Sequence, residues 1–130
     1  MALKRKRSTI VASLDGWFSK YIRLKYSKNG VGTCFTCGQK AEWKELQAGH
    51  FQSRVKYSTR WNEDNVRPQC ARCNISNGGQ QYVFGLRLNQ EREGLADEMV
   101  KLSHEIRKFS NGELEEMESY YREQVKRLLE

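Results

Sequence analysis

Two cysteine pairs, Cys34-x-x-Cys37 and Cys70-x-x-Cys73, constrain the fold of this chain more than any other feature of its sequence. Two such pairs can place four thiolates around one tetrahedral metal ion, and Zn²⁺ fills a tetrathiolate site best. Every cysteine of the 130-residue chain belongs to these pairs. The alternative is two disulfides, but cysteines this close together are typical of metal knuckles, and no secretory signal precedes them. We therefore predict one structural zinc site formed by all four cysteines.

The composition indicates a single domain with a small apolar core. Hydrophobic residues make up 38% of the chain, and the mean hydropathy is −0.84. A structural zinc would supply stability that such a core lacks. No apolar run is long enough to span a bilayer, so we expect no membrane segment.

The positive charge of the chain is large and unevenly distributed. The formal net charge is +7 and the pI is near 9.4, which favours a polyanionic partner, most simply nucleic acid. The alternative is a basic surface that serves only solubility. Positive residues gather at the N-terminus and around the second cysteine pair. The residues that we expect to contact phosphates are Lys4, Arg5, Lys6, Arg7, Arg54, Lys56, Arg60, Arg67 and Arg72.

Hydrophobic periodicity and turn residues divide the domain into four parts. Apolar residues recur at helical spacing near the N-terminus and in two C-terminal stretches, which Asn111-Gly112 separates. We expect the two C-terminal helices to pair as an αα-hairpin. The predicted parts are a basic arm at 1–7, an N-terminal helix at 8–28, a zinc-stapled core at 33–92 and the C-terminal helices at 95–130.

Short extended segments are predicted inside the core. One lies around residues 43–46 and ends at the turn that carries His50, and the other lies at 65–69, where a proline argues against a helix. A polar, basic loop joins them. A helix is expected from Cys70 onward, with an interruption near 77–79. Two short strands followed by a helix predict an α+β fold in which zinc holds the strands against the helix.

The zinc site would bring His50, Asn65 and Asn74 together in one cleft. Hydrolysis of a phosphodiester needs a base to deprotonate water, and histidine suits this role because its unperturbed pKa is about 6.5. An asparagine side chain or a backbone carbonyl must orient the base. Negative charge must be neutralised, usually by Mg²⁺ with hard oxygen ligands, such as the amide oxygen of Asn74. Each residue also has a purely structural explanation, because histidines often serve only as hydrogen-bonding residues and asparagines often cap turns or helices.

These residues resemble a known nuclease motif. His50 in QAGHF, Asn65 in NEDNV and Asn74 after the last cysteine are similar to the HNH, or ββα-metal, motif set between zinc knuckles. The strings LDGWFSKYIRLK, TCFTCG, LQAGHFQSR, TRWNEDNV and QCARCN resemble the phage NinG (Rap) recombination proteins over about residues 14–88.

The resemblance implies an endonuclease that cuts branched DNA, a Holliday junction or a flap, during phage recombination in the cytoplasm of a bacterial host. His50 would be the general base and Asn65 would orient it. A catalytic Mg²⁺ or Mn²⁺ would lie at Asn74 beside His50, while the four cysteines would bind structural zinc. Other recombination proteins are implied partners. Because a four-way junction has two-fold symmetry, we also expect a homodimer formed through the C-terminal helices.

One position departs from the nuclease pattern. Many HNH nucleases place Asp or His just before the base, whereas this chain has Gly49. Glu45, Gln47 and Asp64 are near in sequence, but nothing in the sequence places them in the cleft. Another residue supplies the ligand, metal binding is weak, or the chain binds DNA without cutting it efficiently. The alternative function is therefore a non-catalytic zinc-containing protein that binds DNA and assists recombination. A third is a zinc domain for protein interactions whose positive charge is incidental.

Overall fold

The computed structural model describes residues 4–130 and confirms the α+β class. The α-helices are α1 (Arg7–Lys25), α2 (Tyr57–Arg60), α3 (Gln81–Glu91), α4 (Leu95–Ser103) and α5 (Asn111–Leu129). The strands are β1 (Val31–Thr33), β2 (Lys40–Glu42), β3 (Gln47–His50) and β4 (Val66–Gln69). Three short helical segments complete the structure: η1 (Trp43–Glu45), η2 (Glu63–Asn65) and the π-helical η3 (Arg72–Ser76). Residues 1–3 of the predicted arm lie outside the described residues. Within 4–130, no helix is long and apolar enough to cross a bilayer.

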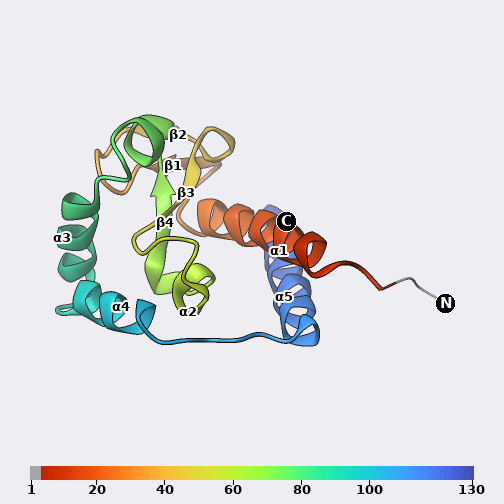
Figure 1. Ribbon diagram of the computed structural model, residues 1–130. Helices are drawn as coiled ribbons and strands as arrows, with labels where there is room; N and C mark the ends of the chain where they lie inside the picture. The colour runs from red at the N-terminus through yellow and green to blue at the C-terminus, as the bar shows by residue number, and fades with distance from the viewer. Residues whose placement is uncertain (1–3) are drawn as a thin grey trace.

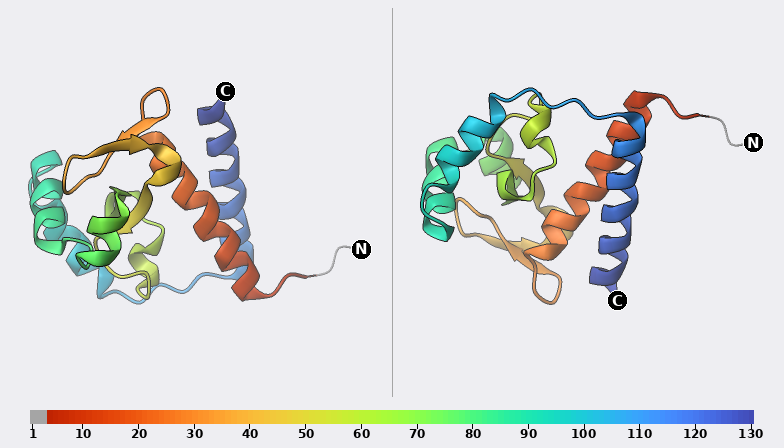
Figure 2. Two further views of the ribbon diagram at one scale, coloured as in Figure 1. Left: turned by 90° about the horizontal axis from the view of Figure 1, so that it is seen from above. Right: turned by 90° about the horizontal axis from the view of Figure 1, so that it is seen from below.

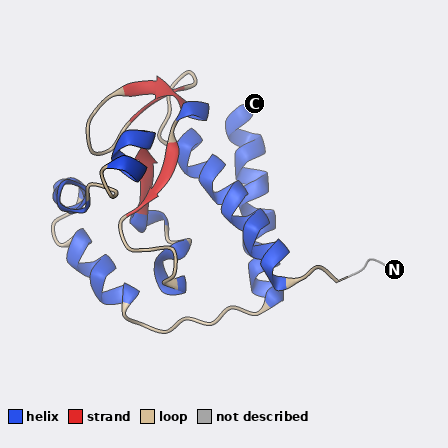
Figure 3. Cartoon of the chain, turned by 45° about the horizontal axis from the view of Figure 1, so that its top comes forward, coloured by secondary structure: helices blue, strands red, loops and turns tan. Residues whose placement is uncertain are grey.

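The strands form two separate antiparallel pairs, β1–β2 and β3–β4. The β3–β4 pair lies among the helices, and the β1–β2 pair lies at the upper edge of the molecule (Figure 3). In the second pair, Gln47 lies opposite Gln69 and His50 lies opposite Val66. The strand predicted around 43–46 is wrong in position, because these residues lie in and next to η1 and the strand begins at Gln47. The backbone N–H of Trp43 donates to the carbonyl of Gly30 over 2.9 Å. This bond holds residues 43–46 against the β1–β2 hairpin, so the chain has to turn at η1 before β3 can pair with β4.

Helices α1 and α5 pack against each other and form the larger apolar core (Figures 1 and 2). The rings of Phe18 and Tyr121 meet edge to face with centroids 4.9 Å apart, a favoured aromatic geometry. Helix α5 begins with a capping box, in which the Ser110 hydroxyl accepts from the Glu113 N–H over 3.1 Å. The buried residues of this core are Ile10, Leu14, Phe18, Ile22, Trp61, Val66, Leu114 and Tyr121.

A second, smaller core lies between α3 and α4. Its buried residues are Phe84, Leu88, Leu95, Ala96 and Met99. The β3–β4 pair connects the two cores, because Val66 belongs to the first and Phe51, just after β3, packs against the second.

The predicted αα-hairpin of the C-terminal helices is wrong. Helix α4 packs against α3 and α2, whereas α5 packs against α1. The segment 104–110 joins the two helices and runs along the lower edge of the molecule in Figure 1. An extended segment of this length reaches about 20 Å, which lets the helices find different partners. Amphipathic spacing identifies an apolar helix face but not the surface that covers it.

Candidate functional site

The four cysteines form one cluster whose geometry fits a tetrahedral metal ion. Their sulfur atoms all lie within 4.8 Å of one another, and the sulfurs of Cys37 and Cys70 are 3.8 Å apart. Sulfurs bound to zinc at about 2.3 Å would be separated by about 3.8 Å. All four cysteines are free of disulfides. The cluster can therefore hold a structural metal such as zinc, and the disulfide alternative is not realised.

The electrostatics of the cluster also favour a bound cation. Burial opposes ionisation of Cys34, but the backbone N–H groups of Cys37 and Cys70 and the Thr36 hydroxyl lower its pKa to about 6. Burial, supported by the neighbouring cysteines, raises the pKa of Cys73 to about 12. Four sulfurs this close cannot all be thiolates unless a cation lies between them, because like charges repel strongly at this distance.

The buried side chain of Gln69 connects this cluster with strand β3. Its Nε2 donates to Thr36 Oγ1 over 3.1 Å and to the Gly79 carbonyl over 2.9 Å. The Thr36 hydroxyl in turn lies 3.6 Å from Cys34 Sγ. Gln69 Oε1 is buried without a hydrogen-bond partner among the described residues. A Cβ added at Gly49 would lie only 1.8 Å from this oxygen, so the position before the candidate base has no room for a side chain.

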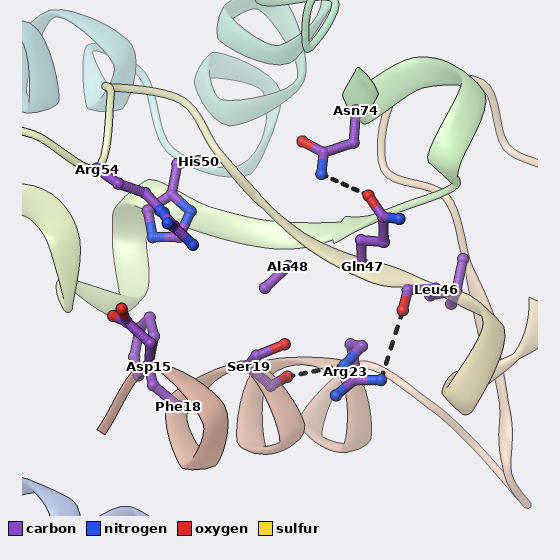
Figure 4. Close-up of a pocket in the computed structure, with 10 residues that line it drawn as sticks. All are labelled: Asp15, Phe18, Ser19, Arg23, Leu46, Gln47, Ala48, His50, Arg54 and Asn74. Carbon is purple, nitrogen blue, oxygen red and sulfur yellow. Dashed lines mark hydrogen bonds between the residues drawn. The ribbon is translucent and has the colours of Figure 1, made fainter. Parts of the chain in front are cut away.

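A cavity of about 360 Å³ separates α1 from β3 and η3 (Figure 4). We call its α1 side, with Asp15, Ser19 and Arg23, the helix wall. The opposite side, with β3 and Asn74, is the hairpin wall. The lining residues are Asp15, Phe18, Ser19, Arg23, Leu46, Gln47, Ala48, His50, Arg54 and Asn74. The structure thus brings two of the three predicted catalytic residues, His50 and Asn74, to one cavity.

His50 is held in the form that a general base requires. Its Nε2 lies 2.9 Å from the carbonyl oxygen of Arg60. A carbonyl can only accept, so Nε2 carries the hydrogen and Nδ1 keeps its lone pair. Burial lowers the pKa of His50 below its ordinary value of 6.5, and the bond to Arg60 opposes this only in part. His50 is therefore neutral at pH 7, with one nitrogen able to accept a proton.

Asn65, predicted to orient His50, makes no hydrogen bond to it. Its side chain is fully buried, and Nδ2 donates to the carbonyls of Gln52 at 3.1 Å and Thr59 at 3.0 Å. Its Oδ1 accepts from the Gln52 N–H over 2.8 Å. These bonds fix both ends of the loop between the strands, including the residue beside Arg60. The Arg60 carbonyl therefore orients His50 directly, and Asn65 positions the loop that carries this carbonyl.

Asn74 lies on η3, directly after the last cysteine. Its Nδ2 donates to Gln47 Oε1 over 2.8 Å. This bond fixes the amide so that Oδ1 is turned away from Gln47 (Figure 4), and the residue lines the cavity. Asn74 thus offers one oriented neutral oxygen to the cavity.

One protein family matches this chain over its full length. The family model described as Bacteriophage Lambda NinG protein matches residues 1–130, the whole chain. The chain belongs to the NinG family. No curated protein and no solved structure matches it. Membership of NinG suggests a recombination-related function in a bacteriophage.

The basic residues predicted to contact phosphates differ in their surroundings in this NinG chain. Arg54, Lys56 and Arg72 are exposed, and Arg54 also lines the cavity. Arg60 instead forms an ion pair with Asp15 at 2.5 Å. Arg67 is only 2% exposed and pairs with Glu91 at 2.7 Å. A buried guanidinium that already has its carboxylate partner has little to offer DNA, so the position of Arg67 fits a structural role.

The N-terminal block is exposed, but two of its members contact α5. The Arg5 guanidinium donates to both carboxylate oxygens of Glu118 over 2.8 Å and to Glu115 over 3.2 Å. Its hydrogen bonds lower the pKa of Glu118 to about 2. Arg7 donates to Asn111 over 2.9 Å. Lys4 and Lys6 are exposed and remain candidates for phosphate contact.

The residues of the helix wall have no role in the site predicted from the sequence. Asp15, Ser19 and Arg23 follow one another at four-residue spacing, one position beyond the apolar residues of α1, so they share one helix face. The Asp15 carboxylate accepts from the Arg60 guanidinium and from Trp61 Nε1 at 2.9 Å. A polar stripe beside an apolar one was visible in the sequence. What could not be read was that this stripe would face His50 rather than solvent.

Proposed function

We propose that this NinG protein is a metal-dependent endonuclease that cuts branched DNA during phage recombination in the host cytoplasm. The observation that carries the proposal is the hydrogen bond between His50 Nε2 and the Arg60 carbonyl. It fixes a neutral histidine with a basic Nδ1 in the wall of a cavity. Family membership supports the recombination context, and the net charge of +7 supports a polyanionic substrate.

A structural Zn²⁺ at the four cysteines would hold the hairpin wall in shape. The second cysteine pair directly precedes Asn74, so the metal would fix where Asn74 enters the cavity. The first cysteine pair is also linked to β3. Cys34 contacts Thr36, Thr36 accepts a hydrogen bond from Gln69, and the Gln69 side chain packs against Gly49. Zinc would therefore act on the geometry of the base without touching the substrate.

In the proposed reaction, His50 Nδ1 takes a proton from the attacking water while the Arg60 carbonyl stabilises the imidazolium that forms. Arg54, at the rim of the cavity, donates to a phosphate oxygen. When bound at Asn74 beside His50, Mg²⁺ or Mn²⁺ would supply neutralisation of charge on the leaving oxygen. The Asn74 Oδ1 suits such a hard cation. Asp15, the carboxylate in the cavity lining, positions Arg60 and Trp61, and both of its oxygens already accept hydrogen bonds from them.

The second candidate function is a DNA-binding recombination protein that does not cut. Two observations favour it. Among residues 4–130, the cysteines are the one group of three or more His, Cys, Asp or Glu side chains placed to hold a metal ion. The position before His50 also has no room for a ligand. A catalytic metal held chiefly by amide oxygens would bind weakly.

A cleavage assay separates the two functions. A labelled four-way junction and a linear duplex of matched sequence are incubated with zinc-loaded protein, with Mg²⁺, with Mn²⁺, or without added divalent metal. We expect metal-dependent cutting of the junction by the wild type and loss of cutting in His50→Ala. Exposed His104 provides the matched control, and His104→Ala should cut like the wild type. Tight junction binding without cutting in any condition would establish the second function instead.

We also propose that the protein acts on junctions as a homodimer. The apolar face of α5 is already packed against α1, so a dimer through the C-terminal helices would use residues left outside this core, such as Tyr120, which is 51% exposed. Light scattering of the free protein and of its junction complex tests this. One protomer per junction at high concentration would rule it out.

A further inference from the structure

Within residues 4–130, Arg23 is a half-buried positive charge in the cavity without a carboxylate partner, whereas Arg54, the other arginine of the lining, is exposed to solvent. Arg23 lies on α1 and lines the same cavity as His50 (Figure 4). Its Nε donates to the Ser19 carbonyl over 3.2 Å, and its Nη1 reaches the Leu46 carbonyl only at 3.5 Å. Both partners are neutral backbone oxygens, and the second contact is at the long limit of a hydrogen bond.

The other half-buried or buried arginines near the site have carboxylate partners. Arg60 pairs with Asp15, and Arg67 pairs with Glu91. No such pair involves Arg23 among the described residues, and burial lowers the pKa of its guanidinium without an acidic group to oppose the shift. Removing a cation from water without a counter-charge costs free energy. A bound anion would recover this cost, so the arrangement is that of a site prepared for one.

We propose that Arg23 is a second phosphate-binding residue of the cavity, opposite Arg54 and placed on α1 to hold the phosphodiester on which His50 acts. This inference rests on the proposed nuclease function for the identity of the phosphate, but the anion site itself does not require cutting. Arg23 belongs to the helix wall, outside the segment that contains the cysteines, His50 and Asn74. The two walls would then divide the reaction: the hairpin wall supplies the base, and the helix wall holds the substrate in place.

The simpler role for Arg23 is structural. It lies in the last turn of α1, where a positive side chain interacts favourably with helix carbonyls. Its guanidinium carbon also lies 5.2 Å from the centre of the Trp43 ring. Together with the two hydrogen bonds, these contacts engage Nε, Nη1 and a face of the guanidinium, but none of them supplies a negative charge. They leave the charge unpaired, and a structural role predicts no effect on the salt dependence of DNA binding.

The test compares wild type, Arg23→Lys, Arg23→Gln and Arg127→Ala. Gln keeps a donor for the carbonyls and packs on Trp43 without charge, so the fold should persist, as thermal melting and zinc content will verify. Arg127 on α5 is an exposed arginine outside the cavity lining, with a side chain that is 67% exposed. Junction binding is measured at several salt concentrations without added divalent metal, because a chelator would also strip the zinc. Cutting is then started with Mg²⁺.

For Arg23→Gln we expect the plot of log association constant against log salt concentration to become less steep by about 0.9, which corresponds to the loss of one phosphate contact. The single-turnover rate should fall about 100-fold to 1000-fold, as when one preorganised donor is removed. Arg23→Lys should restore the slope but only part of the rate, because an ammonium lacks the planar fork. Arg127→Ala should leave both unchanged. An Arg23→Gln protein with the wild-type slope would overturn the proposal. If the wild type never cuts, but Arg23→Gln reduces the salt dependence of junction binding as expected, the proposed nuclease function is wrong and the proposed anion site is supported.

Discussion

The two walls of the cavity are built in different ways. The helix wall is one face of a helix of 19 residues, α1, whose adjacent apolar face is packed against α5 by buried aliphatic and aromatic residues. The hairpin wall consists of four-residue strands and a five-residue π-helix. Those elements bury few apolar side chains of their own and lie next to the cysteine cluster. Apolar packing thus holds one half of the site, and the other half lies beside a cysteine cluster that can hold a metal ion.

Because different interactions hold the two halves, we expect them to fail separately. Loss of the metal should release the hairpin wall and leave the α1–α5 core intact, whereas a cavity in that core should loosen the helix wall and leave the cysteines able to bind metal. Because the proposed chemistry needs both walls at once, either failure should abolish cutting.

The largest effect is expected when one cysteine of the cluster is removed. In Cys70→Ser, zinc binding should fail and DNA cutting should disappear, because the hairpin wall depends on the site. Structural zinc contributes about 10–16 kcal/mol of apparent folding free energy in small zinc-finger peptides, so the loss should dominate the stability of this region. Near-UV circular dichroism and zinc content report the loss, and far-UV circular dichroism should keep most of the helical signal. Full activity in a variant that binds no zinc would contradict the account.

A smaller effect is expected from a cavity in the core that holds the helix wall. Leu114 on α5 is fully buried, so Leu114→Ala should lower the free energy of unfolding by about 2–5 kcal/mol. Urea denaturation measures this change. Zinc content should remain that of the wild type, the reverse of the cysteine variant. Loss of zinc in Leu114→Ala would mean that the two walls fold as one unit.

Two glycines should respond to the same substitution with opposite signs. Gly49→Ala forces a Cβ against Gln69 Oε1, and overpacking of this kind costs about 1–3 kcal/mol. Gly16 on α1 has nothing within 4 Å of an added Cβ, so Gly16→Ala should stabilise the helix by about 0.5–1 kcal/mol. Thermal melting compares the two. If Gly49→Ala were as stable as the wild type, the close approach of Gln69 to β3 would be wrong.

The smallest effect concerns pH. Burial lowers the pKa of His50 below 6.5 in the folded protein, so below about pH 6.5 the unfolded chain binds the proton more readily. The stability from the neutral histidine is therefore fully present above pH 6.5 and is lost as the pH falls through the folded-state pKa. The loss should not exceed about 1.4 kcal/mol per pH unit. Urea denaturation at several pH values tests this, and His50→Asn should remove this contribution while His104→Ala should not.

The sequence identified the hairpin wall much better than the helix wall. The cysteine spacing correctly predicted that four thiols would cluster. Of the three residues expected in one cleft, His50 and Asn74 line one cavity, whereas Asn65 is buried outside it. The roles of Asp15 and Arg23 depend on how α1 lies over β3, which is a long-range contact that periodicity does not encode. For the same reason the apolar faces of α4 and α5 were visible, but their partners were assigned wrongly.

The surroundings of His50, the candidate base, were also only partly predictable. A histidine needs an orienting acceptor, and the sequence offered Asn65 because side chains can be read from it, whereas backbone carbonyls cannot. The structure uses the Arg60 carbonyl for this bond and Asn65 to position the loop. Similarly, Gly49 was recognised as a departure from the nuclease pattern. Its cause, the side chain of Gln69 beneath it, comes from the neighbouring strand and became visible only in three dimensions.

The most direct test of the central claim is chemical rescue of the base. Single-turnover cutting of a labelled four-way junction is measured with Mg²⁺ for the wild type, for His50→Gly, and for His50→Gly with added imidazole. We predict that His50→Gly loses cutting and that free imidazole restores part of it, while adding nothing to the wild type. A His50→Gly protein that cuts at the wild-type rate without imidazole would show that His50 is not the base. The account would then be wrong at its centre.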